Sequence, residues 1–457
     1  MKVLIPADGT LKKICGEKKT TENKCYRTTA HCIEIPVEEG HLLYHTLTGE
    51  LLLLSDTEWR EKENGSIRRE LIRRWYLVPI EHDEKKHADE IFKVMRLLQK
   101  NDKVLRSFTI LTTLDCNARC FYCYELGGAR TVMDRKTAYE TADFIIRASQ
   151  GKKVSLTWFG GEPLYNSDAI DQICERLRDA DVEFSSRMVS NGYLFDSDLV
   201  QHAKSQWKLE RVQITLDGTE EIYNRTKGFI YHDGSAYRRV LRNIGLLLDA
   251  EIRVIIRLNM NRDNADDLIK LVQELSDCFY GKKGLTVYTA LLHQFGKNSV
   301  GAFEDDCSAF SRYCELTERI WQLGLGKEKS LQNTVKLNCC MADSDNSILI
   351  LPDGRLGKCE HETEKNLIGS IRDDSLDNST IQMWKEPLKN DKCGNCPLYP
   401  RCMKLKHCAQ YEKGCHTLDK EIVLYDLRTC IEKAYKRIKE GEPTLSTETE
   451  TNDSQLC

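Results

Sequence analysis

The sequence of 457 residues lacks any long apolar run. No stretch approaches the 18 or more apolar residues of a membrane span, and the N-terminal sequence MKVLIPADGTLKK is too polar to contain a signal-peptide core. We therefore expect neither a transmembrane segment nor export, and the sequence favours a cytoplasmic location.

The sequence also lacks an excess of charge of either sign. Its 67 Lys and Arg residues stand against 71 Asp and Glu residues, which gives a formal net charge of −4. Such a balance offers no electrostatic reason to bind nucleic acid or an anionic membrane surface, so neither is an expected partner. With 40% hydrophobic residues, general disorder is excluded.

Cysteine, in contrast, is abundant. The chain contains 20 cysteines, and most of them stand in two regions, one around residue 120 and one between residues 339 and 430. In a reducing compartment, clustered cysteines bind metal more often than they form disulfides. The sequence therefore predicts metal centres in both regions.

Hydrophobic periodicity predicts an α/β fold from residue 106 onward. Strand-like runs alternate with amphipathic helices, which implies a parallel sheet with right-handed crossovers, open or curled toward a partial TIM-like (β/α)6 barrel. In such folds the catalytic groups lie at the carboxyl ends of the strands. The predicted strands are Phe108–Leu114, Val154–Trp158, Arg187–Ser190, Val212–Leu216, Val254–Asn259 and Leu285–Thr289.

The rest of the chain predicts smaller parts on either side of this sheet. HLLYHTLTGELLLLS, at 41–55, predicts a β-hairpin within a small N-terminal α+β module. The cysteine-rich C-terminal region is short of apolar runs, so it would need metal to fold. The predicted parts are the module at 1–105, the sheet domain at 106–325, a cluster-binding domain at 326–440 and a disordered tail at 441–457.

Three cysteines outside the motifs are predicted to be core residues. Cys174 belongs to an apolar stripe at helical spacing, and Cys307 and Cys314 lie on the apolar face of a helix predicted over 303–321. Buried free cysteine packs as a small hydrophobic residue, so none of these three is expected to bind metal.

The most specific motif is LDCNARCFYCYE, directly after the first predicted strand of the sheet. Cys116, Cys120 and Cys123 have the spacing C-x3-C-x2-C, and three thiolates from one loop can hold three irons of a [4Fe–4S] cluster. A zinc site would require a fourth protein ligand, and the only candidates near the motif are carboxylates. The motif resembles the radical SAM superfamily, in which S-adenosylmethionine (SAM) binds the fourth iron and is reductively cleaved to a 5′-deoxyadenosyl radical. The resemblance makes the aromatic Tyr122 a cofactor-binding residue.

Motifs at the ends of the next two strands strengthen the resemblance. Gly160, Gly161 and Glu162 match the family's GGEP motif, whose backbone and acid receive the methionine amino group. Glycines let the chain approach a ligand closely, and a carboxylate suits an ammonium group. Ser190 and Asn191 stand where the family places polar contacts to the ribose.

Later strand ends carry weaker signals. The resemblance assigns Arg257 and Asn259 to binding of the SAM carboxylate or ribose. The alternative, which is equally compatible with the sequence, is that they are surface residues whose hydrogen bonds are made within the protein or to water. Asp217, in an LDGT sequence that similar enzymes carry, either orients substrate or closes a turn.

The C-terminal cysteines resemble the SPASM extension of radical SAM enzymes that modify peptides and proteins. The fuller form of that extension carries two auxiliary [4Fe–4S] clusters, but here Lys406 replaces one family cysteine and Cys408 follows two residues later. Cys339 and Cys430 are alternative ligands, and structural zinc is an alternative metal. The resemblance assigns one cluster to Cys340, Cys359 and Cys408, and the other to Cys393, Cys396, Cys402 and Cys415.

Glu360 is the candidate catalytic base. Similar sulfatase-maturating enzymes have an aspartate at this position that deprotonates substrate, and a general base must stand beside the reacting carbon. The alternative is an exposed acid in a polar loop.

Together the resemblances imply a radical SAM/SPASM oxidoreductase that abstracts hydrogen from a ribosomal precursor peptide and forms a thioether or another crosslink. Such an enzyme needs an electron donor such as flavodoxin or ferredoxin. The N-terminal module would bind the peptide leader at a strand edge around 42–55. The alternatives are a sulfatase-type maturase that oxidises Ser or Cys of a protein, and a zinc-binding interaction protein without catalysis.

Overall fold

The computed structural model describes most of the chain, which forms two compact units. Unit 1 comprises Met1–Lys100, Glu328–Asp343 and Glu386–Cys457, and unit 2 comprises Asn101–Lys327 and Ser344–Lys385. Cys339 and nearly all of the predicted disordered tail lie outside the described residues. The described residues are 1–10, 13, 25–98, 104–123, 125, 129–292, 301–327, 331, 340–389, 391–400, 402, 404–409 and 414–442.

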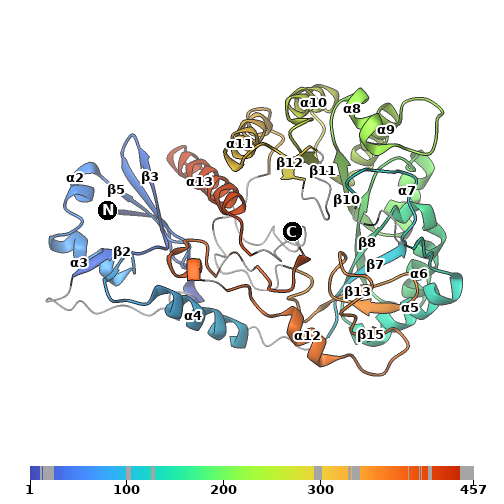
Figure 1. The fold of residues 1–457 in the computed structure, drawn as a ribbon, viewed down its shortest axis with the longest axis horizontal. Helices are drawn as coiled ribbons and strands as arrows, with labels where there is room; N and C mark the ends of the chain where they lie inside the picture. The colour runs from blue at the N-terminus through green and yellow to red at the C-terminus, as the bar shows by residue number, and fades with distance from the viewer. Residues whose placement is uncertain are drawn as a thin grey trace. The chain divides into compact units, whose positions relative to one another are not determined.

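Unit 2 is built on a sheet whose first six strands are parallel and lie in chain order (Figure 1). All six strands coincide with the predicted ones to within a few residues, so the predicted α/β fold with six βα units is confirmed. These strands are β7 (Ser107–Thr113), β8 (Val154–Gly160), β9 (Phe184–Ser190), β10 (Leu209–Leu216), β11 (Arg253–Met260) and β12 (Leu285–Leu291).

Three further strands extend this sheet beyond β7. β13 (Ser347–Ile350) pairs with β7 in parallel, and β14 (Arg355–Gly357) and β15 (Gly369–Ser370) follow in antiparallel pairing. The short α12 (Asn378–Trp384) closes this segment. The chain thus returns to the edge of the sheet after a long excursion, which local periodicity did not predict.

Helices cover one face of the parallel strands (Figure 1). Ile170, Ile173 and Cys174 on α6 are completely buried, as the predicted apolar stripe requires. Asp134 caps α5 by accepting a hydrogen bond from the Thr137 N–H at 2.7 Å. The helices are α5 (Arg135–Ser149), η1 (Pro163–Asn166), α6 (Ser167–Asp179), α7 (Ser197–Gln206), α8 (Glu220–Lys227), α9 (Ala236–Asp249), α10 (Ala265–Cys278) and α11 (Asp306–Gln322).

The core face predicted for the helix over 303–321 is wrong. α11 buries Ala309, Tyr313, Leu316 and Ile320, whereas Cys307 is exposed. The buried residues and the predicted cysteines both recur at helical spacing, on different faces of the helix. Only the packing of the helix on the rest of the unit decides which face is covered.

Unit 1 contains a four-stranded antiparallel sheet in the order β1-β5-β4-β3. The predicted hairpin is confirmed, because β4 pairs with β5 around Thr48 and Gly49. The strand edge predicted around 42–55 is wrong, however, since β4 and β5 each pair on both sides and the sheet ends at β1 and β3. The strands are β1 (Lys2–Ile5), β3 (Cys32–Val37), β4 (Gly40–His45) and β5 (Leu51–Leu54), with β2 (Tyr26–Thr28) paired to β6 (Leu77–Pro79).

The C-terminal helix α13 (Thr417–Lys439) shares one core with this sheet. Leu427 and Ile431 of α13 are buried in the same cluster as Ile33 and Leu42. None of the helices in the described residues is both long enough and apolar enough to span a membrane. The other helices of unit 1 are α2 (Asp56–Arg60), α3 (Gly65–Arg73), α4 (Glu84–Leu98) and η2 (Asp391–Asn395).

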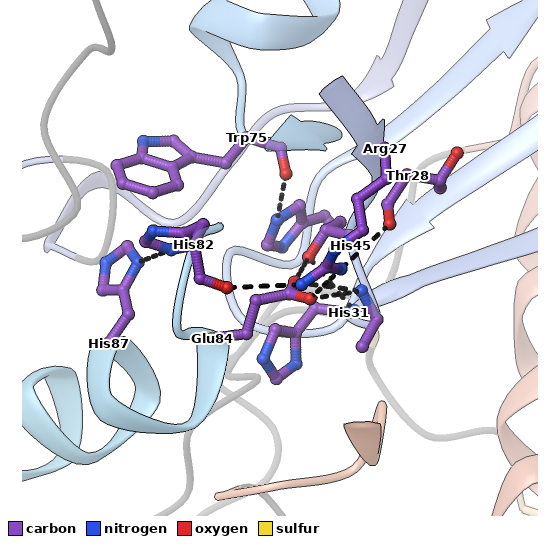
Figure 2. A network of polar contacts seen from close by, with 10 residues as sticks. Arg27, Thr28, His31, His45, Trp75, His82, Glu84 and His87 are labelled. Atoms are coloured by element: carbon purple, nitrogen blue, oxygen red, sulfur yellow. Dashed lines mark hydrogen bonds and ion pairs between the residues drawn. The ribbon is translucent and has the colours of Figure 1, made fainter. Parts of the chain in front are cut away.

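A buried polar network joins the strands of unit 1 to the start of α4 (Figure 2). The Glu84 carboxylate accepts hydrogen bonds from Arg27, from the Thr29 hydroxyl and from the Ala30 N–H. Burial lowers the pKa of His31 to about 4 and that of His45 to about 3, so both imidazoles are neutral near pH 7. Because the acid already has donors on both oxygens, this network is a structural core and not a vacant site.

Candidate active site

The loop of Cys116, Cys120 and Cys123 begins where β7 ends, at the carboxyl edge of the parallel sheet. The Asp115 side chain accepts a hydrogen bond from the Cys116 N–H at 2.8 Å, which fixes the start of the loop. Burial raises the pKa of Cys116 to about 12, and the nearby Glu162 adds to this rise. The Cys123 N–H donates to the Cys120 carbonyl oxygen at 3.1 Å, so the three thiols stand on one short, folded loop. The loop stands where the sequence predicted it.

These neighbouring thiols fit a [4Fe–4S] cluster. In such a cluster each thiolate binds its own iron, so the sulfur atoms need not converge on one point. A single zinc ion requires convergence, and no three His, Cys, Asp or Glu side chains in the described parts of the chain are arranged to hold one metal ion.

The glycines of the GGEP motif lie directly against this loop. Gly160 has a φ of +120°, and a Cβ there would lie 2.1 Å from the Thr113 carbonyl oxygen. A Cβ on Gly161 would lie 2.3 Å from the carbonyl oxygen of Asp115. No other residue type fits either position, because both contacts are with backbone atoms.

Glu162 ties the ends of three strands together. Its side chain is fully buried and accepts hydrogen bonds from the Ser190 hydroxyl at 2.9 Å, the Asn191 N–H at 2.8 Å and the Leu164 N–H at 3.2 Å. Its own N–H donates to the Asp115 carbonyl oxygen at 2.9 Å. Burial raises the pKa of Glu162 to about 7 against the effect of these donors.

Asn191 connects this arrangement to the cysteine loop. Its amide Nδ2 donates to the Asn117 Oδ1 at 2.7 Å and lies 3.8 Å from the Cys116 sulfur. The structure therefore brings together Cys116, Glu162, Ser190 and Asn191, which stand on three different segments of the sequence.

A second buried network holds the other side of the loop, and sequence reasoning missed most of it. The Tyr122 hydroxyl donates to the Asp217 carboxylate at 2.9 Å, and Lys227 Nζ lies 2.9 Å from the Tyr122 oxygen and 3.0 Å from Asp217. The Lys227 and Asp217 side chains are 4% and 1% exposed. Asp217 therefore serves the cluster loop. The sequence offered only one indication of this network, which is the single lysine of α8, Lys227.

The backbone of Lys227 contacts the same loop. Its carbonyl oxygen accepts a hydrogen bond from the Arg119 N–H at 2.8 Å and lies 3.9 Å from the Cys120 sulfur. A buried ion pair loses its hydration, and this cost offsets most of the attraction between the two charges. Lys227 and Asp217 therefore serve mainly to hold the loop in place and add little to the net stability of the fold.

Arg257 and Asn259 lie two residues apart on β11 and therefore point to the same face of the sheet. Arg257 Nε donates to the Asn259 Oδ1 at 2.9 Å. Glu360 is partly buried in the same unit. Burial chiefly lowers the pKa of His361, which Glu360 raises and Arg257 lowers.

Three C-terminal cysteines, Cys393, Cys396 and Cys402, stand on one folded stretch of chain, in which the Cys396 N–H donates to the Cys393 carbonyl oxygen at 3.3 Å and the Cys402 N–H to the Leu398 carbonyl oxygen at 2.8 Å. Burial raises the pKa of Cys402 to about 11, and the charges of Cys396 and Cys393 add to it. Cys415, assigned to the same cluster, is exposed and its thiol lies 3.8 Å from the His416 carbonyl oxygen. Cys430 packs beside the apolar core of unit 1.

The other predicted auxiliary set falls in both units. Cys340 and Cys408 belong to unit 1, whereas Cys359, which is buried, belongs to unit 2.

Fold and site together define an α/β domain with a cysteine loop at the carboxyl ends of parallel strands. Residues 110–275 match the family model of the radical SAM superfamily. The match includes the three cysteines, the GGEP motif, Ser190 and Asn191. Residues 110–275 thus form a radical SAM domain.

Curated relatives match a part of the chain. A probable GTP 3′,8-cyclase of Methanocaldococcus jannaschii is 26% identical over 184 residues, which are 38% of this chain and 58% of the relative. One of Pyrobaculum aerophilum is 28% identical over 190 residues, 39% of this chain and 57% of the relative. The chain thus spans little more than half the length of these relatives.

The fold also resembles that of anSMEcpe. The structure of histidine-tagged anSMEcpe with bound AdoMet has a TM-score of 0.56 at 15% identity, with 72% of this chain and 99% of that chain covered. Native anSMEcpe with bound AdoMet and the Cp18Cys peptide has a TM-score of 0.54 at 16% identity, with 73% and 99% covered. At this identity the likeness shows a shared fold.

Proposed function

We propose that this protein uses SAM to abstract a hydrogen atom from a side chain of a ribosomally made peptide. The observation that carries the proposal is the convergence of the cysteine loop, the Gly160-Gly161 turn and Asn191 at the carboxyl edge of the sheet. A [4Fe–4S] cluster bound there supplies the electron that cleaves SAM to methionine and a 5′-deoxyadenosyl radical.

The residues around the loop bind and orient the cofactors. Cys116, Cys120 and Cys123 would hold the cluster, and Asp217 and Lys227 fix Tyr122 in the same loop. Gly160 and Gly161 let the end of β8 lie directly against the backbone that leads into the cysteine loop, while Glu162 holds Ser190 and Asn191 in place. Arg257 and Asn259 contribute charge and an amide from β11.

Glu360 removes a proton from the substrate in this proposal. It is partly buried and stands next to His361, whose pKa is lowered chiefly by burial. A base in that position can accept a proton from a carbon or heteroatom next to the substrate radical.

A peptide is the proposed substrate. anSMEcpe, whose fold this chain shares, was solved with a bound peptide. In unit 1, β3 ends the sheet within the described residues, and an extended peptide can add to such an edge by backbone hydrogen bonds. The C-terminal cysteines are proposed to hold two auxiliary [4Fe–4S] clusters, with flavodoxin or ferredoxin as the cytoplasmic electron donor.

Two products are compatible with this chemistry. A thioether crosslink removes two hydrogens and blocks a cysteine, whereas a sulfatase-type reaction oxidises Ser or Cys without joining residues. Mass spectrometry of a genetically linked peptide, combined with alkylation, separates the two. A mass loss of about 2 Da with a blocked cysteine and a new link between residues fits the crosslink. Without a new link, a loss of about 2 Da at a serine, or of about 18 Da at a cysteine whose sulfur is replaced by oxygen on hydrolysis, fits the oxidation.

The proposal is tested by replacing one cluster ligand. We expect Cys120→Ala to abolish formation of 5′-deoxyadenosine from SAM under dithionite, because the remaining two thiolates cannot hold the cluster. The matched control is Cys307→Ala, which removes an exposed cysteine outside every motif and should leave SAM cleavage unchanged. SAM cleavage by the Cys120 variant at the normal rate would refute the assigned site.

A further inference from the structure

A buried amide donor without a partner lies inside the cysteine loop. Asn117 follows Cys116 directly, and its side chain is completely buried. Its amide nitrogen Nδ2 makes no hydrogen bond within the part of the chain that the structure describes. An unpaired buried donor destabilises a fold, and most buried polar groups in proteins therefore have a partner. The Asn117 nitrogen is thus available to an acceptor that a bound group brings to the loop.

A chain of hydrogen bonds that starts at a backbone N–H fixes the orientation of the Asn117 amide. The Tyr193 N–H can only donate, so the atom of Asn191 that it contacts at 3.0 Å is the acceptor Oδ1. The nitrogen of the same amide, Asn191 Nδ2, donates to Asn117 Oδ1 at 2.7 Å. A flipped Asn117 amide would set two donors against each other. The atom of Asn117 that lacks a partner is therefore the nitrogen and not the oxygen.

The Asn117 amide lies beside the sulfur of Cys116. Asn117 Oδ1 is 3.9 Å from Cys116 Sγ, and Asn191 Nδ2 is 3.8 Å from the same sulfur. The Ala118 N–H donates to this sulfur at 3.4 Å. The backbone of Asn117 is also held, because its carbonyl oxygen accepts a hydrogen bond from the Ile230 N–H at 3.0 Å. The unpaired donor thus stands in a fixed part of the loop, next to one of the three thiols.

A cluster sulfur is the acceptor that fits an amide donor at this place. The sulfides and thiolates of a [4Fe–4S] cluster carry negative charge, and hydrogen bonds to them help to set the reduction potential. Reduction adds one electron, so the reduced form is more negative by one charge. An N–H donor stabilises the more negative form more strongly, and the effect is larger where water is excluded.

We propose that Asn117 Nδ2 donates a hydrogen bond to a sulfur of the cluster and raises its reduction potential, so that the cluster is easier to reduce. This inference rests on the proposed function and adds to it a residue that controls the first electron transfer. Asn191, which holds the Asn117 amide, is a positioning residue for the same donor.

The test is a redox titration of the anaerobically reconstituted full-length enzyme without SAM, followed by electron paramagnetic resonance. The signal to follow is the one that disappears when Cys116, Cys120 and Cys123 are all replaced by Ala. We expect Asn117→Leu to shift the reduction equilibrium of this cluster about tenfold toward the oxidised form, because the reduced form loses a hydrogen bond to a charged acceptor. For one electron a tenfold shift is about 59 mV.

A second variant separates the donor from the packing around it. Asn117→Asp keeps an oxygen to which Asn191 can donate and replaces the amide nitrogen by a second oxygen. At alkaline pH, where the carboxylate is ionised, it should lower the potential at least as much as Asn117→Leu, because a negative charge opposes the added electron. The matched control is Asn378→Leu, the same change at an exposed position on α12, which should leave the potential unchanged. If Asn117→Leu does not bind the cluster, Asn117→Asp decides the question.

The opposite outcomes are distinct. An unchanged potential in an Asn117 variant that binds the cluster would overturn the proposed hydrogen bond, and a loss of SAM affinity in that variant would assign the donor to SAM instead. A potential lowered by Asn117→Leu but not by Asn117→Asp would make displacement of Asn191 the cause and would also overturn it. These results leave the proposed function standing. A wild-type enzyme that neither binds a reducible [4Fe–4S] cluster at this loop nor cleaves SAM would overturn the proposed function itself.

Discussion

At the scale of single residues, the cluster loop depends on partners far away in the sequence. Tyr122 bonds to Asp217, which is 95 residues away, and to Lys227, which is 105 residues away. The Asp217 and Lys227 side chains are almost completely buried and Tyr122 is partly buried, so each depends on the charge of the others. The loop that carries the cysteines is therefore held by a network that no local motif contains.

We expect Lys227→Met to lower the free energy of unfolding of the cluster-free protein by about 3–5 kcal/mol, because it leaves the buried Asp217 carboxylate without its cation. Chemical denaturation measures this change. The double variant Lys227→Met with Asp217→Leu should recover most of the loss, since no buried charge remains.

The control for this prediction is an ion pair at the surface. Lys153 and Glu183 lie 2.7 Å apart with side chains 58% and 71% exposed, so Lys153→Met should cost less than about 1 kcal/mol. Equal effects of the two lysine substitutions would contradict the role of the buried network.

At the scale of elements, α13 belongs to the core of the N-terminal sheet although it stands near the end of the chain. Ile431 is completely buried against the sheet. We expect Ile431→Ala to lower the free energy of unfolding by about 2–5 kcal/mol, because the cavity cannot fully close. Val423→Ala on the same helix, at a side chain 43% exposed, should cost far less. Equal effects in thermal unfolding would mean that α13 does not pack as described.

The histidines of unit 1 predict acid sensitivity of the same elements. His31 and His45 have folded-state pKa values of about 4 and 3, below the ordinary 6.5, because burial disfavours their charged forms. The unfolded chain therefore binds more protons in this range. Stability is complete above pH 6.5 and is lost as the pH falls toward the folded values.

Between pH 6.5 and pH 5 each histidine should contribute a loss of about 2 kcal/mol. The measurement is thermal unfolding of the full chain as a function of pH. The double variant His31→Gln with His45→Gln should show a flatter pH dependence over this range, whatever its absolute stability. An unchanged slope would contradict the burial of both rings.

At the scale of the whole molecule, the proposal requires three [4Fe–4S] clusters and hence about twelve irons per chain after anaerobic reconstitution. Replacing Cys116, Cys120 and Cys123 together by Ala should remove about one third of the iron and leave the remaining electron paramagnetic resonance signals in place. Loss of all the iron would contradict independent clusters. Bound zinc in place of iron and sulfide would favour the interaction protein.

The sequence by itself determined the parts whose information is local. The spacing of Cys116, Cys120 and Cys123, the adjacent glycines at 160 and 161 and the six strands follow from short motifs and periodicity, because each depends on neighbours within a few residues.

Only the tertiary structure decided the rest. The bond from Tyr122 to Lys227, the bond from Asn191 to Asn117, the face of α11 that is buried and the packing of α13 on the N-terminal sheet all join distant segments. A one-residue change of strand register or a rotation of a helix would alter these contacts and leave every local pattern intact. Packing of whole elements, which no short stretch of sequence contains, therefore set how the predicted cysteine loop is held and how its buried amide is oriented.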